Sequence, residues 1–298
     1  MINVFRFLMI CTISVAFASI AWAQTYQQVD YPGAVLTELV GGPNPQGTSV
    51  GTWQDSTGVF HGFTVTAKGV FATFDPPGST FTSPSFISPQ EVIVGEYLDS
   101  TFVSHGFILD GGQYTFVNAP GAAGTTLSGI NPSGEISGFT CSDPACGQTG
   151  LANTSHSFVE SKTGVFTIFD PPGATSSSAS TVNPSGAVVG AYTDTVGELL
   201  HGYLLKNGTY TTIDFPAALY GTFAGGGNPE NDIVGLYNYT ASCTADCNHA
   251  FLLHNGVFTS FDYPGAIFTE ATGINPGGVI VGVFEDSSSN VHGFIRTP

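Results

Sequence analysis

Short apolar runs of strand length, separated by turn residues, follow one another along the whole chain. Between Asp214 and Asp262, for example, four such runs occupy residues 222–226, 232–237, 249–253 and 257–262. Asn-Pro and Asn-Gly dipeptides stand between them, and both favour tight turns. No stretch stands out with apolar residues at helical spacing. The pattern therefore predicts an all-β protein built from many short strands.

These runs belong to a repeat that returns six times. Six positions carry the motif Asp-x-Pro or its variant with Asn, at spacings of 45, 43, 52, 44 and 48 residues. Repeats of this length with four strands each are typical of β-propellers. We therefore expect a six-bladed β-propeller with four antiparallel strands per blade. The repeats align at Asp30, Asp75, Asn118, Asp170, Asp214 and Asp262.

The two ends of the repeat series complement each other. His292, near the C-terminus, has no acidic partner downstream, and Asp30 has no histidine upstream. A strand at residues 26–30 would supply the missing outer strand of the last blade and close the ring, which leaves no long open edge. We expect a contact between His292 and Asp30 across this closure.

Counting residues through the hairpin of the third and fourth strands sets a histidine opposite each acidic position. Asn207-Gly208 is a preferred dipeptide for a type I′ turn, and pairing outward from it places His201 opposite Asp214. Loops that are one residue longer and end in glycine keep this alignment through a bulge. We expect structural pairs at His61–Asp75, His105–Asn118, His156–Asp170, His201–Asp214, His249–Asp262 and His292–Asp30.

An aromatic residue follows each of these histidines by two positions and therefore lies on the same face of the strand. Large aromatic side chains at such regular positions are expected to pack between blades. The six residues are Phe63, Phe107, Phe158, Tyr203, Phe251 and Phe294.

The first 23 residues differ from the rest in composition. They hold a single charge, Arg6, a largely apolar run over residues 7–17 and the triplet Ala21-Trp22-Ala23. This pattern is typical of a secretory signal peptide that is cleaved before Gln24. A membrane anchor is the alternative, which the short apolar run disfavours. We expect a signal peptide at 1–23, a single propeller domain at 24–298, and secretion to the periplasm or the medium.

Four cysteines follow the signal segment, in two clusters within the two longest repeats. An even number of cysteines in a secreted chain indicates disulfides, here Cys141–Cys146 and Cys243–Cys247. The alternative is a zinc ion bound by all four cysteines, which the roughly hundred residues between the clusters disfavour.

Acidic residues outnumber basic ones by 22 to 5, although only 9% of the residues are charged. Such a surface repels nucleic-acid phosphates and anionic membranes, so we expect neither as a partner. The same net charge keeps the protein soluble, and we expect a monomer.

No motif for a cofactor, a metal or a catalytic nucleophile is present, and we expect none of these. The six histidines lie on the third strand of each blade, roughly 10 Å outside the first, so they form too wide a ring to share one metal ion. Among the Thr, Ser and Gly of the innermost strands, Glu38 and Glu270 stand out. Ring closure makes their blades neighbours, so the two carboxylates could form an acid–base pair or bind a cation. The alternative is that both are solvated acids of an acidic protein.

The repeat with the consensus GINPxGxIVGxYxDS, followed by HGF or by His249-Ala250-Phe251, resembles the HAF-repeat extracellular proteins. The resemblance covers essentially the whole chain after the signal segment, and departs from the pattern at Asn118 and at Gly41-Gly42-Pro43-Asn44-Pro45. It implies a secreted bacterial protein and no particular activity.

Three functions remain open at this point. The first is a non-catalytic propeller that binds a carbohydrate, a peptide or an envelope component. The second is a hydrolase or lyase that acts on polysaccharide through channel or loop carboxylates. The third is a structural surface protein with no small ligand.

Overall fold

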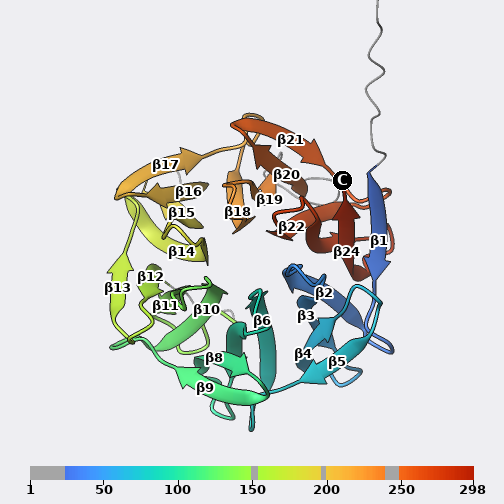
Figure 1. Ribbon diagram of the computed structural model, residues 1–298, viewed down its shortest axis with the longest axis horizontal. Helices are drawn as coiled ribbons and strands as arrows, with labels where there is room; N and C mark the ends of the chain where they lie inside the picture. The colour runs from blue at the N-terminus through green and yellow to red at the C-terminus, as the bar shows by residue number, and fades with distance from the viewer. Residues whose placement is uncertain (1–23, 149–153, 196–198, 239–247) are drawn as a thin grey trace, which may run out of the picture.

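The computed structural model describes residues 24–148, 154–195, 199–238 and 248–298. Within these ranges the chain forms 24 β-strands and no helix, and hence no helical segment that would span a membrane. The strands form small antiparallel sheets arranged like propeller blades around a central axis (Figure 1). The expected signal peptide and the cysteines Cys243 and Cys247 lie outside the described residues.

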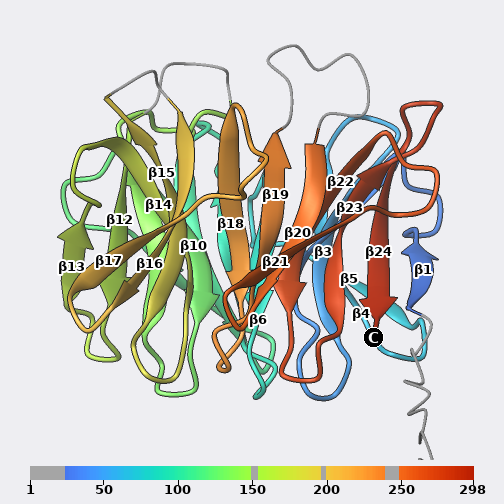
Figure 2. The same ribbon diagram turned by 90° about the horizontal axis from the view of Figure 1, so that it is seen from above.

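In each repeat the strands run from the axis outward in chain order, and we call these four positions a, b, c and d (Figures 1 and 2). The innermost strands, at position a, are β2 (Leu36–Gly41), β6 (Phe81–Ile87), β10 (Gly124–Ile130), β14 (Ala174–Val182), β18 (Gly221–Gly227) and β22 (Phe268–Ile274). The strands at position b are β3 (Ser49–Gln54), β7 (Ile93–Leu98), β11 (Ile136–Cys141), β15 (Val188–Asp194), β19 (Ile233–Asn238) and β23 (Ile280–Glu285).

Positions c and d form the outer hairpin of each repeat. The strands at position c are β4 (Phe60–Val65), β8 (Ser104–Asp110), β12 (Ser155–Glu160), β16 (Leu200–Lys206), β20 (Asn248–His254) and β24 (Val291–Thr297). The strands at position d are β5 (Phe71–Phe74), β9 (Gln113–Val117), β13 (Phe166–Phe169), β17 (Thr209–Ile213), β21 (Val257–Phe261) and β1 (Thr25–Val29). We number the repeat units 1 to 6 by their position a strands, from β2 to β22.

Hydrogen bonding divides the 24 strands into five sheets rather than the six separate sheets that the sequence predicts. Four sheets have four strands each, and the fifth has eight. The eight-stranded sheet arises because Leu200 of β16 pairs with Gly221 of β18 in a single parallel step between units 4 and 5. Only four units are therefore separate four-stranded sheets. This one contact between units could not be inferred from strand patterns within a repeat.

The chain ends meet in one sheet. Strand β1 pairs antiparallel with β24, with Tyr26 opposite Arg296 and Val29 opposite Gly293. The N-terminal strand thus completes the sheet of β22, β23 and β24. Next to it, Nδ1 of His292 lies 2.7 Å from a carboxylate oxygen of Asp30.

The hairpins between positions c and d follow the turn chemistry of the sequence. Asn207 and Gly208 have φ angles of 51° and 74°, and Asn255 and Gly256 have φ angles of 50° and 77°. Positive φ at both central residues is what a type I′ turn requires, and Asn and Gly tolerate it best. The turn fixes the register, which brings each histidine opposite its acidic partner.

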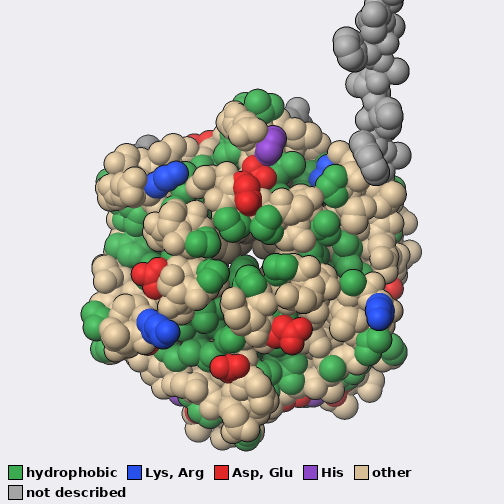
Figure 3. Space-filling model, viewed as in Figure 1, with side chains coloured by type: hydrophobic (Ala, Val, Ile, Leu, Met, Phe, Trp, Pro, Cys, Tyr) green, Lys and Arg blue, Asp and Glu red, His purple; other side chains and the backbone are tan. Residues whose placement is uncertain are grey.

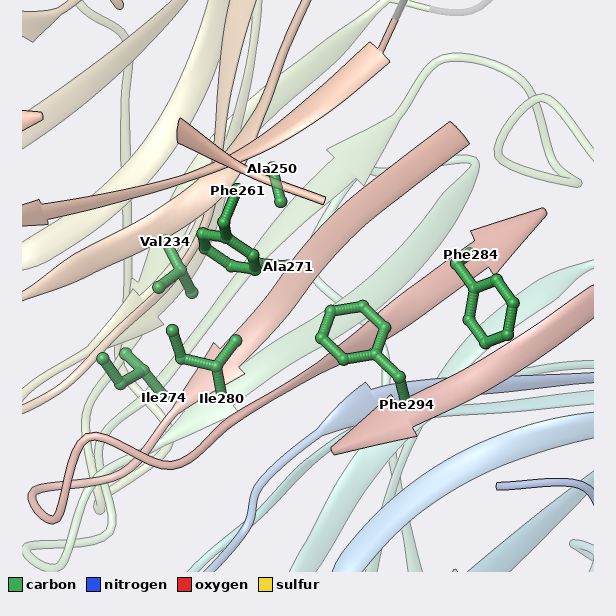
Figure 4. Close-up of a cluster of buried hydrophobic side chains, with 8 residues drawn as sticks. All are labelled: Val234, Ala250, Phe261, Ala271, Ile274, Ile280, Phe284 and Phe294. Carbon is green, nitrogen blue, oxygen red and sulfur yellow. The ribbon is translucent and has the colours of Figure 1, made fainter. Parts of the chain in front are cut away.

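The core lies between neighbouring sheets rather than in one central cluster. In one such cluster, Phe261 and Ala250 of unit 5 meet Ala271, Ile280 and Phe294 of unit 6 (Figure 4). The six aromatic residues that follow the histidines are fully buried in this core between the sheets, as the sequence predicts. They are Phe63, Phe107, Phe158, Tyr203, Phe251 and Phe294.

A glycine on strand b makes room for each of these rings. A Cβ atom on Gly282 would lie 2.0 Å from the carbonyl oxygen of Glu270 and 2.6 Å from the ring of Phe294. At Gly51 the corresponding distances are 2.1 Å to Glu38 and 2.6 Å to Phe63. The glycine of the IVG motif is therefore a packing requirement of the repeat.

Candidate functional site

The six innermost strands enclose a central channel. Side chains alternate along a strand. On β2, Thr37 and Leu39 are therefore buried between sheets, and the alternate residues Glu38 and Val40 face the channel. Two cavities of about 250 and 300 Å³ lie next to each other and share the lining residues Val40, Glu270 and Thr272. Hydroxyl side chains make up the larger part of the polar wall of the 250 Å³ cavity. They are Ser83, Ser85, Thr126, Ser128, Ser178, Ser180 and Thr272.

The structure brings the two glutamates of the sequence prediction together. Glu38 of β2 and Glu270 of β22 line the same 300 Å³ cavity, on strands that ring closure makes neighbours. Burial, and in second place the charge of Glu38, raises the pKa of Glu270 to about 7. Burial also raises the pKa of Glu38. Near neutral pH Glu270 is therefore partly protonated.

This pair can do three kinds of chemistry. A protonated Glu270 beside an ionised Glu38 can donate one hydrogen bond and accept others, as a polyhydroxylated ligand requires. The same arrangement matches an acid–base pair. The two carboxylates also attract cations, although no group of three or more His, Cys, Asp or Glu that could hold a metal ion occurs among the described residues. Of the residues that the structure describes, no Lys or Arg lines either cavity.

Two further carboxylates near the channel were missed by sequence reasoning. One is Glu285, which also lines the 300 Å³ cavity, and the other is Glu96. Glu96 of β7 is buried, with 7% of its surface exposed, and burial raises its pKa. One carboxylate oxygen accepts hydrogen bonds from Ser104 Oγ at 2.9 Å and Thr126 Oγ1 at 2.7 Å, and the other accepts one from Gln148 Nε2 at 3.2 Å. Glu96 therefore anchors the loop after β11 to the channel wall. In the sequence, the feature that could have indicated Glu96 is its position as the single charged residue within the apolar run of β7.

The predicted His–acid pairs lie at the outer hairpins, away from the channel. In all six units the histidine Nδ1 contacts a side-chain oxygen of the residue predicted from the strand count. The distances are 2.8 Å for His61–Asp75, 2.7 Å for His105–Asn118, 2.8 Å for His156–Asp170, 3.0 Å for His201–Asp214, 3.0 Å for His249–Asp262 and 2.7 Å for His292–Asp30.

Four of these histidines have a second acidic neighbour that was not predicted. Their Nε2 atoms lie 3.3 to 3.6 Å from an aspartate at the end of strand b or in the turn that follows it. The four aspartates are Asp55, Asp99, Asp194 and Asp286. In the Asp55 turn, hydrogen bonds from the side chain of Thr57 and the backbone of Val59 hold the pKa of the carboxyl at about 2. The recurring Asp of the YxDS motif was the available signal.

An aromatic ring of strand b covers the histidine ring in five units. The centroid distances are 4.7 Å for Trp53–His61, 5.3 Å for Tyr97–His105, 5.1 Å for Tyr192–His201, 5.4 Å for Tyr237–His249 and 4.9 Å for Phe284–His292. In three of these units a further ring from the preceding repeat stacks on the aromatic residue: Tyr31 on Trp53, Phe215 on Tyr237, and Tyr263 on Phe284. These stacks explain why the histidines are largely enclosed.

Cys141 and Cys146 form the expected disulfide, with sulfurs 2.10 Å apart. Zinc needs free thiolates, so this bond contradicts the alternative of one zinc ion held by all four cysteines. The loop that the disulfide closes also reaches unit 2, because the carbonyl of Pro144 accepts a hydrogen bond from the backbone of Ser104 at 2.7 Å.

The opposite end of the channel is apolar. Its mouth is a cavity of about 100 Å³ lined by the Asn-Pro turns between strands a and b, with Ile130, Val182 and Ile274 among its walls. Lys68 and Lys162 lie in c–d turns on the same side, and Lys206 ends the strand before such a turn. Figure 3 looks onto one face of the ring, with basic side chains spaced around a hollowed centre.

No family model matches the chain, and no curated protein matches it either. Among solved structures, a putative TolB from Agrobacterium tumefaciens is similar with a TM-score of 0.59 and 13% identity, over 87% of this chain and 89% of that one. The six-bladed fungal lectin of Aleuria aurantia has a TM-score of 0.54 and 13% identity, over 87% and 91%.

A mutant of AofleA from Arthrobotrys oligospora has a TM-score of 0.55 and 12% identity, over 91% of this chain and 86% of that one. At such low identity these likenesses establish the β-propeller fold and nothing finer.

Proposed function

We propose that this chain is a secreted, non-catalytic, six-bladed β-propeller that binds a carbohydrate in its central channel. The eight-stranded sheet supports the count of six, because it divides into two four-stranded antiparallel halves joined by one parallel step. The disulfide fits an oxidising compartment outside the cytoplasm, as does the signal-peptide pattern of residues 1–23. The resemblance of the repeat to the HAF-repeat extracellular proteins agrees with both.

The observation that carries the proposal is the composition of the channel wall. Hydroxyl side chains of strands β6, β10, β14 and β22 surround a space that also contains the rings of Phe139 and Phe223 and the carboxylate of Glu270. Aromatic faces and clustered hydroxyl and carboxylate groups match the two kinds of surface that a sugar presents, an apolar face and a polar edge. The described part of this lining holds no basic residue, which favours neutral or cationic saccharides over anionic ones.

Calorimetric titration of the protein without residues 1–23 tests this proposal. Neutral oligosaccharides, chitosan oligomers and polygalacturonate fragments serve as neutral, cationic and anionic probes. We expect binding of the first or second class that Glu270→Gln weakens by about tenfold, which corresponds to about 1.4 kcal/mol. Glu230→Gln, which removes the same charge from an exposed turn, should leave binding unchanged. Equal binding by both variants would remove the channel pair from consideration.

An enzyme remains the second candidate, because Glu270 with a pKa of about 7 beside Glu38 matches a general acid next to a general base. This candidate predicts that the bound oligosaccharides are cleaved, with a release of reducing ends or of unsaturated products. Glu270→Gln would then abolish turnover while binding persists. Incubation without any new product would leave binding as the function.

The same lectin and TolB neighbours make a peptide or protein ligand the remaining alternative, as a proposal from fold alone. A chain that binds no saccharide of any of the three classes would favour this alternative or a structural surface role.

A further inference from the structure

Unit 3 departs from the other five at its outer hairpin. In the five others, the residue of strand b that pairs with the histidine is aromatic, as with Tyr97 opposite His105 and Phe284 opposite His292. In unit 3 the same register places Thr140 opposite His156. The aromatic ring that covers each of the other histidines is therefore absent at this one.

The second layer of the stack is absent as well. In units 1, 5 and 6 a ring from the preceding repeat, such as Tyr31 or Phe215, stacks on the strand b aromatic residue. The residue at that position before unit 3 is Ala119, which directly follows Asn118. Compared with units 1, 5 and 6, two large side chains are thus replaced by a threonine and an alanine at the same place in the fold.

Among the described residues, none refills the space left by these rings. A cavity of about 290 Å³ lies there, lined by His156, Thr140, Ser142, Thr154, Ile168 and the turn residues 120–122. The side chain of His156 is 47% exposed, whereas the other five paired histidines are 17 to 24% exposed. We call this cavity the unit 3 slot.

The histidine at the base of the slot is held in a defined orientation. Its Nδ1 lies 2.8 Å from Asp170, whose other carboxylate oxygen accepts a hydrogen bond from Ser177 Oγ at 2.6 Å. Nδ1 therefore donates, and in the neutral ring Nε2 presents a lone pair. In unit 1, Asp55 lies near Nε2 of His61, and Ser142 occupies the equivalent sequence position in unit 3. Among the described residues, none forms a hydrogen bond with His156 Nε2.

The walls of the slot have two characters. Pro120, Ala122 and Ile168, which is 50% exposed, are apolar. Thr140 and Thr154 bring hydroxyl groups, and the disulfide-bonded Cys141 closes one side. A ligand for this slot needs one apolar ring face and polar groups at its edge.

We propose that the unit 3 slot binds a single pyranose ring, stacked on His156 in place of the missing aromatic side chain. A ligand hydroxyl donates a hydrogen bond to His156 Nε2, and the Thr140 and Thr154 side chains face other edge groups. This site is separate from the channel, and it shares with the proposed function only the class of ligand.

The test measures the slot directly. The probes are the methyl glycosides of glucose, galactose, mannose, fucose and N-acetylglucosamine, together with phenol, and the signal is the imidazole spectrum of His156, assigned with His156→Gln. We expect at least one glycoside to shift the His156 resonances saturably. Thr140→Tyr, which restores the ring found in unit 5, should weaken this binding about tenfold or more. Thr211→Tyr adds the same bulk on an exposed outer strand and should bind as the unchanged chain does.

Each outcome has one meaning. Phenol binding without glycoside binding overturns the proposal and makes the slot a site for aromatic groups. No shift of His156 with any glycoside, or glycoside binding that Thr140→Tyr leaves unchanged, overturns it too. Glycoside binding that is lost in Glu270→Gln but kept in Thr140→Tyr would support the channel and reject the slot. The reverse pattern would support the slot and reject the channel.

Discussion

The two faces of the propeller carry two sets of repeated polar residues that behave differently. At the a–b turns, an Asn or Ser in every unit accepts a hydrogen bond from the backbone N–H four residues further on. These residues are Asn44, Ser88, Asn131, Asn183, Asn228 and Asn275. On the other face, each of the six histidines of the outer hairpins keeps its contact with a side-chain oxygen, but the surroundings of these histidines change from unit to unit.

The difference teaches where to look for function in a repeat protein. Positions that are equal in every unit satisfy buried polar groups and fix turns, so they are needed to close the ring. Positions that differ have no such task. Glu38 and Glu270 in the channel and Thr140 in unit 3 are all departures of this second kind, and each lies beside a cavity.

The largest expected effect comes from breaking a repeated position in the core. Phe294→Ala should lower the free energy of unfolding by about 3–5 kcal/mol, because a fully buried ring leaves a cavity between units 5 and 6. Denaturant unfolding followed by fluorescence measures the loss. Phe116→Ala removes a ring that is 45% exposed and should cost no more than about 1 kcal/mol. Equal losses of unfolding free energy in the two variants would mean that the packing between sheets is not the core.

A smaller effect is expected at a departing position, and it depends on pH. The folded state holds the pKa of Glu270 at about 7, above its ordinary value of 4.5, so folding favours the protonated form. Stability from this group is present at low pH and is lost as pH rises from about 4.5 through 7. Glu270→Gln should remove this loss, which amounts to at most about 3 kcal/mol.

Melting temperatures of the two proteins between pH 4 and 8 check this prediction. The difference between variant and unchanged chain should grow in favour of Glu270→Gln as pH rises. A constant difference over that range would show that Glu270 has an ordinary pKa, and the acid–base reading of the pair would then lose its basis.

Next in size is the ring of turn residues. Asn131 uses its Oδ1 for two backbone N–H groups, while its Nδ2 donates to Glu135 at 2.7 Å and to the carbonyl of Asn183 in the next unit at 3.1 Å. Asn131→Ala should therefore cost about 1–3 kcal/mol of unfolding free energy. Asn183→Ala removes similar Oδ1 contacts and is the matched comparison. A smaller loss of unfolding free energy in Asn183→Ala would give the contribution of the hydrogen bonds that Asn131 Nδ2 donates, including the one to the next unit. Equal losses would show that these hydrogen bonds contribute nothing to stability.

Much of this fold follows from patterns inside one repeat. The dipeptide Asn207-Gly208 fixed a hairpin register, and that register placed His201 beside Asp214. For the strands between Asp214 and Asp262, no end of an expected range differs from the observed strand end by more than one residue. Such features depend on local turn geometry, which a sequence expresses directly.

Features that depend on contacts between repeats were harder to predict. The pairing of Leu200 with Gly221 merges two sheets through a single step. The hydrogen bonds of Glu96 come from side chains 8, 30 and 52 residues away, so no local motif encodes them. Glu38 and Glu270 could be paired only because the closure of the ring was predicted first.

The smallest expected effect restores the repeat where unit 3 departs from it. Thr140→Tyr places a ring over His156, as Tyr237 does over His249. A stacked pair of this kind adds about 0.5–1.5 kcal/mol, so the variant should be slightly more stable than the unchanged chain. Denaturant unfolding checks the change, with Thr211→Tyr as the control for an added exposed ring. A gain at Thr140 would mean that unit 3 forgoes stability that the other units have, as expected of a position kept open for a ligand. A loss would mean that the slot is too narrow for a ring, and a pyranose would then not fit either.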